Sequence, residues 1–171
     1  MAQQDSVSSG NGSDPAGTGA EFSVLAQYIK DMSVENPNAP QVYQWQNQPS
    51  LDVQFNLNAQ KLADDVHEVS IKIEVTAKSD NGVHFVVDLT YAGLFGARNI
   101  PEDSLGPVLL VEAPRLLFPF ARQVVSEAVT NPGFPPRLLD PIDFASAYVA
   151  QAGALGEQTG GVLGATPQGD E

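Results

Sequence analysis

The chain has 171 residues, 42% of them hydrophobic, which is enough for one domain with a core of ordinary size. Its net charge of -13 argues against binding to nucleic acid or anionic membranes, and favours a basic protein partner or simple solubility. The absence of cysteine excludes disulfides and thiol catalysis.

The two ends of the chain have a composition typical of disorder. Residues 1–20 and 152–171 are mostly small or polar and contain no Lys or Arg, because all eight basic residues lie between Lys30 and Arg137. We therefore expect a single ordered domain at 21–151 between two disordered tails. The N-terminal segment has no basic region followed by an apolar one, so we expect no secretory signal and a cytosolic protein.

Period-two alternation of apolar and polar residues predicts four strands. They are expected at Tyr28–Glu35, Leu51–Leu57, Val69–Val75 and Val83–Tyr91. The dipeptide Asn81-Gly82 predicts a type I′ hairpin between the last two strands. A compact connection through Leu62 to His67 predicts an antiparallel meander, whereas a longer link rich in proline joins the first two strands.

The pattern changes to helical spacing after Pro101. Apolar residues recur at Leu117, Phe120, Val124 and Ala128, and we expect Pro114 and Pro119 to break or kink the early part of this helix. A second short helix is expected with Asp140 as its N-cap, Pro141 in the first position and Asp143 in the first turn. Four antiparallel strands followed by two helices indicate an α+β domain.

Acidic side chains are predicted to gather on one face of the sheet. Alternation places Asp31 and Glu35 on the same side of the first strand, together with Ile29, and Val86 and Asp88 on the polar side of the last strand. At about 3.3 Å per residue, Asp31 and Glu35 stand roughly 13 Å apart. That spacing is too wide for one metal ion but suits docking of a basic partner.

Apolar and aromatic side chains predict a second surface, a hydrophobic groove. Tyr43 and Trp45 lie in an otherwise polar link, where core packing does not readily explain two aromatic residues. The other candidate groove residues are Leu51, Val53 and Phe55 on the second strand, and Phe144 and Tyr148 on the last helix.

Catalytic and metal sites find little support in the sequence. Only His67 and His84 could act as bases at neutral pH, and we expect His84 to be a solvated surface residue. The run from Asp64 to Glu68 has the residue types of a metal site but lacks the glycine and alternating ligands of a calcium loop, so a turn is expected. We therefore predict neither an enzyme nor a cofactor.

Several ordered motifs resemble the SecB family of protein-export chaperones over residues 21–151. They are Lys30-Asp-Met-Ser-Val-Glu35, Pro37-Asn-Ala-Pro40, Leu62-Ala-Asp-Asp-Val-His-Glu-Val69, Ala92-Gly-Leu-Phe95 and Leu116-Leu-Phe-Pro-Phe-Ala-Arg122. The resemblance implies a cytosolic holdase that binds unfolded precursor proteins and delivers them to the SecA translocation ATPase. It also implies a homotetramer built as a dimer of dimers.

The resemblance assigns roles to particular residues. It implies that Asp31, Glu35, Val86 and Asp88 dock a basic, zinc-binding tail of SecA, although Val86 and Asp88 replace the commoner Leu and Glu. It further implies that Val87, Leu89 and Tyr91 support assembly, and we expect them to form apolar sheet surface that an oligomer buries. Tails 1–20 and 152–171 are expected only to keep the assembly soluble.

Two other functional classes remain as alternatives. A small-ligand carrier would enclose an apolar pocket between the sheet and a helix, and would not bind unfolded chains. An enzyme would need His67 or the Asp64-Asp65 pair in a cleft.

Overall fold

The computed structural model describes residues 19–160, with side chains described as far as residue 153. The strands are β1 (Glu21–Glu35), β2 (Ser50–Ala63), β3 (Val66–Ser79) and β4 (Gly82–Arg98). A short 3-10 helix, η1 (Gln41–Gln44), lies in the link between β1 and β2. The remaining helices are α1 (Glu102–Pro107), the π-helical segment η2 (Val108–Glu112), α2 (Ala113–Thr130) and α3 (Phe144–Gly160). The predicted α+β class is therefore confirmed.

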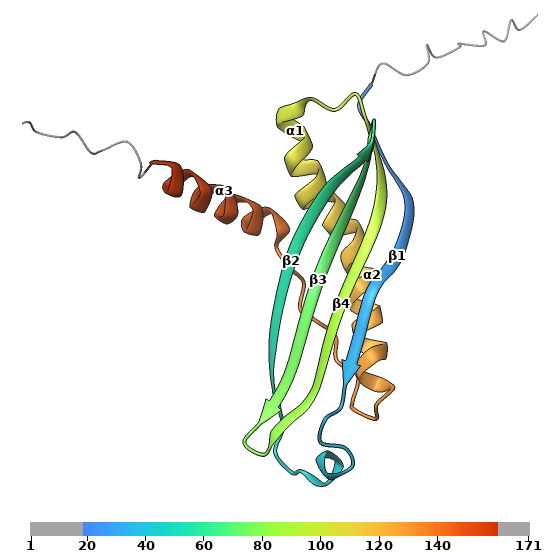
Figure 1. Ribbon diagram of the computed structural model, residues 1–171, viewed down its shortest axis with the longest axis vertical. Helices are drawn as coiled ribbons and strands as arrows, with labels where there is room; N and C mark the ends of the chain where they lie inside the picture. Colours follow the sequence, from blue (N-terminus) through green and yellow to red (C-terminus); the bar gives the residue numbers. More distant parts are fainter. Residues whose placement is uncertain (1–18, 161–171) are drawn as a thin grey trace, which may run out of the picture.

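The strands form one antiparallel sheet in the order β1-β4-β3-β2, so β1 and β2 are its two edges (Figure 1). The long helix α2 lies along one face and packs mainly on the central strands β4 and β3. Figure 1 also shows α3 leaving the sheet on the β2 side. The first strand thus crosses over to pair with the fourth, as the long proline-containing link allows.

The core lies between the central strands and α2. It is built by residues of β3 and β4 that alternate along each strand, including Ile71, Ile73, Leu89 and Phe95, with Leu117 of α2 packed over them. Alternation puts these side chains on one face of the sheet and leaves the opposite face polar. One helix thus covers the two middle strands.

Both turns between adjacent strands are tight, as predicted, but the backbone conformation of the β3–β4 turn differs from the prediction. Asp64 and Asp65 alone connect β2 to β3, and Asp65 adopts a φ of 59°. The β3–β4 hairpin exists, but the predicted type I′ geometry is wrong, because within this turn only Gly82 has a positive φ, of 134°. Glycine accepts this conformation because it has no Cβ.

The helices also depart from expectation. The helical stretch continues from Glu102 to Thr130 through Pro114 and Pro119, so the predicted break is absent. The π-helical segment just before Pro114 gives the backbone a wider turn where a proline lacks its N–H. By length and composition alone this stretch could cross a bilayer, but the buried residues of α2 pack on the sheet, as in the core helix of a soluble protein.

The last helix begins and ends later than predicted. Asp143 provides the capping interactions predicted for Asp140: its Oδ1 accepts a hydrogen bond from the Ser146 N–H at 3.1 Å. The Ser146 hydroxyl donates to the other carboxylate oxygen, and these hydrogen bonds hold the pKa of Asp143 below its ordinary value. The helix runs to Gly160, past Gln151, where the ordered domain was expected to end. Residues 1–18 and 161–171 of the predicted tails lie outside the described residues.

A carboxylate on β3 ties the edge strand β1 to the sheet across β4. Glu68 accepts a hydrogen bond from the Tyr28 hydroxyl and one from Lys30 Nζ at 2.6 Å. Strand β4 lies between β1 and β3, and its Ala92 is the backbone partner of Tyr28. Hydrogen bonds from Lys30 and Tyr28 lower the pKa of Glu68. Burial, together with the hydrogen bond to Glu68 and its charge, raises the pKa of Tyr28 to about 12, so the phenol remains a donor at neutral pH.

We predict that Glu68→Gln destabilises the protein by about 1–2 kcal/mol at pH 7, because charged hydrogen bonds on a largely buried carboxylate are lost. A lowered pKa in the folded state adds stability above the ordinary value of 4.5, and that stability is lost as pH falls through the folded pKa. The difference in the free energy of unfolding between the wild type and the variant should therefore become smaller below pH 4.5. Urea denaturation at fixed protein concentration, at pH 7 and at lower pH, measures it. Glu74→Gln, at an exposed position, is the control, and an equal loss there would contradict the role of Glu68.

Candidate functional site

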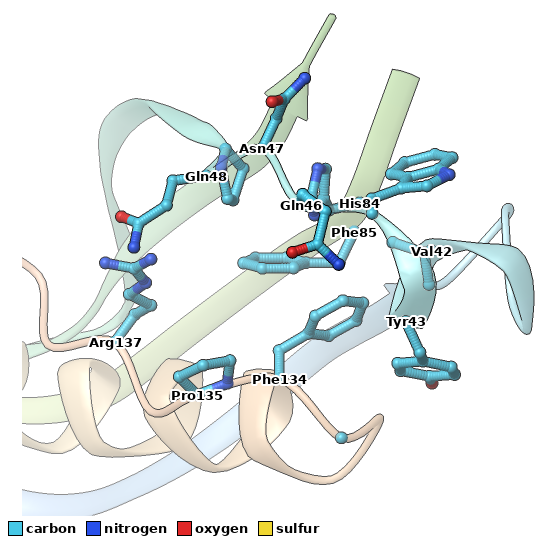
Figure 2. A pocket seen from close by; sticks show the side chains of 13 residues that line it. Val42, Tyr43, Gln46, Asn47, Gln48, His84, Phe85, Phe134, Pro135 and Arg137 are labelled. Atoms are coloured by element: carbon cyan, nitrogen blue, oxygen red, sulfur yellow. The ribbon is translucent and has the colours of Figure 1, made fainter. Parts of the chain in front are cut away.

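Two neighbouring cavities lie on the helix side of the molecule, along the connector between α2 and α3 (residues 131–143). The first has a volume of about 290 Å³ and lies between that connector and the β1–β2 link. Figure 2 shows Phe85 of β4 in the middle of the view, Tyr43 and Val42 to its right, and Phe134, Pro135 and Arg137 of the connector beneath it and to its left. We call this cavity and the second one, described below, the groove.

Tyr43 lines this cavity, as predicted, and both its hydroxyl group and its aromatic ring hold it in place. Its hydroxyl donates to the carbonyl of Pro132 and accepts a hydrogen bond from Asn36 Nδ2 at 2.8 Å. Its ring packs on Phe134 with the centroids 5.8 Å apart. The link is thereby joined to the connector, and the cavity wall is held in place.

Trp45 also lines the first cavity, where its ring meets His84 edge to face at 5.0 Å between centroids. The prediction of a solvated His84 is wrong, since only 5% of the residue is exposed. Its Nε2 lies 2.8 Å from the Ser79 hydroxyl, and burial lowers its pKa. A register irregularity between Ala77 and Lys78 disturbs the simple alternation at this end of the sheet.

The second cavity, of about 350 Å³, lies between β2 and the later part of the connector. Val53 and Phe55 form its β2 side, and Leu139 to Asp143 form the other. Cross-strand pairing with the core residues Val75 and Ile73 directs both side chains to the helix side of the sheet. Even so, 41% of Val53 and 38% of Phe55 remain exposed.

The other predicted groove residues differ in their positions. Leu51 is half-exposed on the same face of β2 but lines neither cavity. Phe144 is only 2% exposed, and its ring contacts Phe55 at 6.1 Å and Phe118 at 5.9 Å, so it supports the groove from the core. Tyr148 is partly buried beside Gly106 and lies outside both cavities.

The sequence analysis missed the connector as a wall of the groove. Phe134, Pro135 and Arg137 line the first cavity, and Leu139 and Ile142 line the second. The available signal was a run of apolar residues and prolines between two predicted helices. Within the described residues, Arg137 has no ion pair. It adds one cation to the apolar and amide side chains of the first cavity, whereas Asp140 and Asp143 add carboxylates to the second.

The predicted acidic face is present on the opposite side of the sheet. Ser33 pairs with Asp88 and Glu35 pairs with Val86, so the side chains of Asp31, Glu35 and Asp88 point away from α2. The prediction that Ile29 shares this face is wrong. A β-bulge between Ile29 and Asp31 shifts the alternation by one residue and turns Ile29 toward the helix side.

Two residues that were not predicted complete the acidic face. Lys72 Nζ lies 3.4 Å from a carboxylate oxygen of Glu74 and 3.7 Å from one of Asp88. The hydrogen bond that Lys72 donates to Glu74 and the charges of Asp88 and Glu74 raise the pKa of Lys72. Counting along the strands from the hairpin would have placed Glu74 opposite a neighbour of Asp88, because a register shift between Ala77 and Lys78 moves the pairing by one residue. Together with Asp31, Glu35 and Asp88, these two residues form a group of four carboxylates and one ammonium group.

The expectation that Val87, Leu89 and Tyr91 form exposed sheet surface is wrong. Val87 and Leu89 are completely buried and Tyr91 nearly so, all within the core of a single chain. The reason is that α2 packs mainly on β4, the strand that carries all three residues. They stabilise the sheet from inside and present no surface to a second chain.

The Asp64-Asp65 segment forms the predicted turn. Asp64 is exposed and lies 3.7 Å from Lys61 Nζ. His67 is buried, and its Nδ1 has no hydrogen-bond partner among the described residues. Across residues 19–160 no three His, Asp or Glu side chains gather in a way that could hold a metal ion.

Comparison with known proteins agrees with this geometry. The family model described as preprotein translocase subunit SecB matches residues 16–154. The protein-export protein SecB of Sphingopyxis alaskensis is 54% identical over 88% of this chain and 86% of its own length. The protein of the same name from Zymomonas mobilis is 55% identical over 77% of this chain and 80% of its own.

A solved structure shares the fold. It is a SecB-like chaperone of Mycobacterium tuberculosis in complex with a ChAD peptide from the HigA1 antitoxin, with a TM-score of 0.59 and 16% identity. The match covers 71% of this chain and 90% of that one. The family model and the two curated relatives show that the chain belongs to the SecB family of protein-export chaperones.

Proposed function

We propose that this chaperone acts as a holdase, which binds unfolded precursor proteins in the groove and keeps them competent for translocation. The observation that carries the proposal is the half-exposed apolar surface of β2 facing the connector. Val53 and Phe55 cannot be covered by α2, and they lie across a cavity from Leu139 and Ile142. An unfolded segment with apolar side chains would remove this surface from water.

The size of the cavities suits weak, repeated contacts. Each holds roughly one or two side chains, so a single groove would bind a short segment with low affinity. A client that reaches several grooves of one assembly gains affinity through effective concentration and still exchanges at each site. Such binding catalyses no reaction and works in the cytosol without nucleotide.

We assign the acidic face to docking of the SecA translocation ATPase. Asp31, Glu35, Val86 and Asp88 lie together on the sheet face opposite the groove, so a basic segment of SecA could bind while a client remains in place. Lys72 neutralises part of the charge of Asp88 and Glu74. Asp31 and Glu35, in contrast, have no ion pair among the described residues, so both carboxylates are available to a cationic partner.

We further propose that the chain forms a homotetramer, a dimer of dimers, through surface other than Val87, Leu89 and Tyr91. Ile29, Met32 and Val34 on the helix side of β1 are each more than one third exposed, as are Leu116 and Phe120 of α2. Exposed apolar side chains of this kind on a small domain are typical of surfaces that a second subunit buries.

We predict that Val53→Ser weakens client binding about fivefold, because one methyl-bearing contact of roughly 1 kcal/mol is lost from the groove. The measurement is the delay in refolding of a reduced, denatured precursor as a function of chaperone concentration. Val149→Ser, at an exposed position of α3 outside the groove, is the matched control. A wild-type protein that leaves the refolding rate unchanged would contradict the holdase function and favour the small-ligand carrier.

We predict that Asp31→Arg lowers SecA affinity at least tenfold at low salt, because a like charge then faces the basic segment. Calorimetric titration of SecA into the chaperone measures the loss, which should shrink as salt screens the charges. Asp103→Arg, which makes the same charge change on an exposed position of α1, should bind SecA normally. Equal losses in both variants would show a net-charge effect without a docking site.

We predict that light scattering of the wild type gives a mass about four times the 18.1 kDa of one chain. Phe120→Asp should dissociate the assembly, because a buried carboxylate without a partner is costly at an apolar interface. Val149→Asp is the control and should leave the mass unchanged. A wild-type monomer, or an intact tetramer in Phe120→Asp, would refute this surface as the interface.

A further inference from the structure

Asp88 is the central carboxylate of the acidic face, and a lysine already pairs with it. Ser33, which lies between Asp31 and Glu35 on β1, is the backbone partner of Asp88 on β4. From the other side, Lys72 of β3 places its Nζ 3.7 Å from a carboxylate oxygen of Asp88. A basic partner that approaches Asp31 and Glu35 therefore meets a bound lysine at the third carboxylate.

A second lysine of the sheet, Lys30, is held much more firmly than Lys72. The Nζ of Lys30 lies 2.6 Å from Glu68, whose side chain is only 11% exposed. Lys72 lies 3.4 Å from Glu74 and 3.7 Å from Asp88, and its side chain is 49% exposed. Exposed ion pairs of this length are weak, because water screens the charges and both side chains lose freedom. The Lys30 pair therefore ties strands together, whereas Lys72 can exchange one of its partners.

A cavity beside Lys72 gives its ammonium group a second position. The cavity has a volume of about 220 Å³, and Gln54 and Asn56 of β2 line it together with Lys72 and Glu74. Because β2 pairs with β3 here, the cavity lies on the β2 side of Lys72, whereas Asp88 lies on the β4 side. The amide oxygens of Gln54 and Asn56 can accept hydrogen bonds from an ammonium group. Lys72 can thus leave Asp88 and keep Glu74.

We propose that Lys72 is an exchangeable counter-ion of Asp88, and that a basic partner binds the acidic face by displacing it toward the cavity beside β2. This inference rests on the proposed docking of SecA and specifies what controls the charge of that surface. Glu74 is a positioning residue, because its carboxylate holds Lys72 when Asp88 is released. Docking then makes Asp31, Glu35 and Asp88 available together to the cations of the partner.

This arrangement favours a segment that carries several positive charges close together. Among the described residues Asp31 and Glu35 have no ion pair, so a single cation can bind there without moving Lys72. Each contact already formed raises the effective concentration of the next cation at Asp88, where that cation competes with Lys72. Proteins with isolated basic residues gain less from the face, and the internal lysine thereby discriminates against them.

The test is calorimetric titration of SecA into the full-length chaperone at low and at high salt. Lys72→Met should tighten binding about fourfold at low salt, because the partner no longer competes with an internal cation. The affinity should also fall more steeply with salt, because one more charge of the face is unpaired. Lys72→Arg keeps the charge and should bind SecA as the wild type does.

Lys61→Met is the matched control for the change in net charge. Lys61 also forms an exposed ion pair, with Asp64 at 3.7 Å, and it lies at the β2–β3 turn. This variant should bind SecA with the affinity of the wild type. Equal tightening in Lys61→Met and Lys72→Met would show an effect of net charge alone and would overturn the proposal.

Glu74→Gln tests the positioning role through a double-mutant cycle. The single change should weaken SecA binding about threefold, because Lys72 then has Asp88 as its one carboxylate partner. In the Lys72→Met background the same change should alter the affinity by less than about 1.5-fold. A full loss in that background would mean that Glu74 contacts SecA itself, and would overturn its role as a positioning residue.

Unchanged or weaker binding of SecA by Lys72→Met would overturn the exchange of Lys72. The docking of SecA on the acidic face would survive that result if Asp31→Arg still loses affinity. If Asp31→Arg binds SecA as well as the wild type does, the docking surface and the role of Lys72 are refuted together.

Discussion

Packing of a single long helix against a four-stranded sheet governs this structure. Helix α2 covers β3 and β4 and buries residues such as Leu89 and Ile73 completely, but it is too narrow to cover the two edge strands. The apolar face continues onto those edges because β1 and β2 also direct apolar side chains to the helix side, where they pair with core residues of β4 and β3. Side chains such as Val53 on β2 and Met32 on β1 are therefore left about 40% exposed.

The two incompletely covered edges have different consequences. On β2 the connector approaches the strand without closing over it, and the space between them is the second cavity of the groove. On β1 the apolar residues have no such neighbour, which is why we assign them to subunit contact. Exposed apolar surface is a liability in a lone domain, and the proposed client groove and subunit interface would each cover one part of it.

The polar face of the sheet does not depend on how α2 packs, because it lies on the side opposite the helix. Its carboxylates gather because β1 crosses over to pair with β4, which brings Ser33, between Asp31 and Glu35, opposite Asp88. Glu68 reinforces this pairing by binding Tyr28 and Lys30 across β4. The surfaces that we propose for the client and for the ATPase thus lie on opposite faces of one sheet.

The sequence by itself determined the strands, the α+β class, the acidic face and the family, because alternation and ordered motifs are local properties of the chain. It placed Asp31, Glu35 and Asp88 on one face even though it missed the β-bulge beside them. Tertiary structure decided what each apolar side chain faces. Val87 and Leu89 proved to be core, Phe144 supports the groove from below, and His84 is buried beneath Trp45. The connector forms a groove wall for the same reason. The exposure of a side chain depends on where α2 ends and on which strands it leaves uncovered, and no local sequence pattern encodes how far the helix reaches across the sheet.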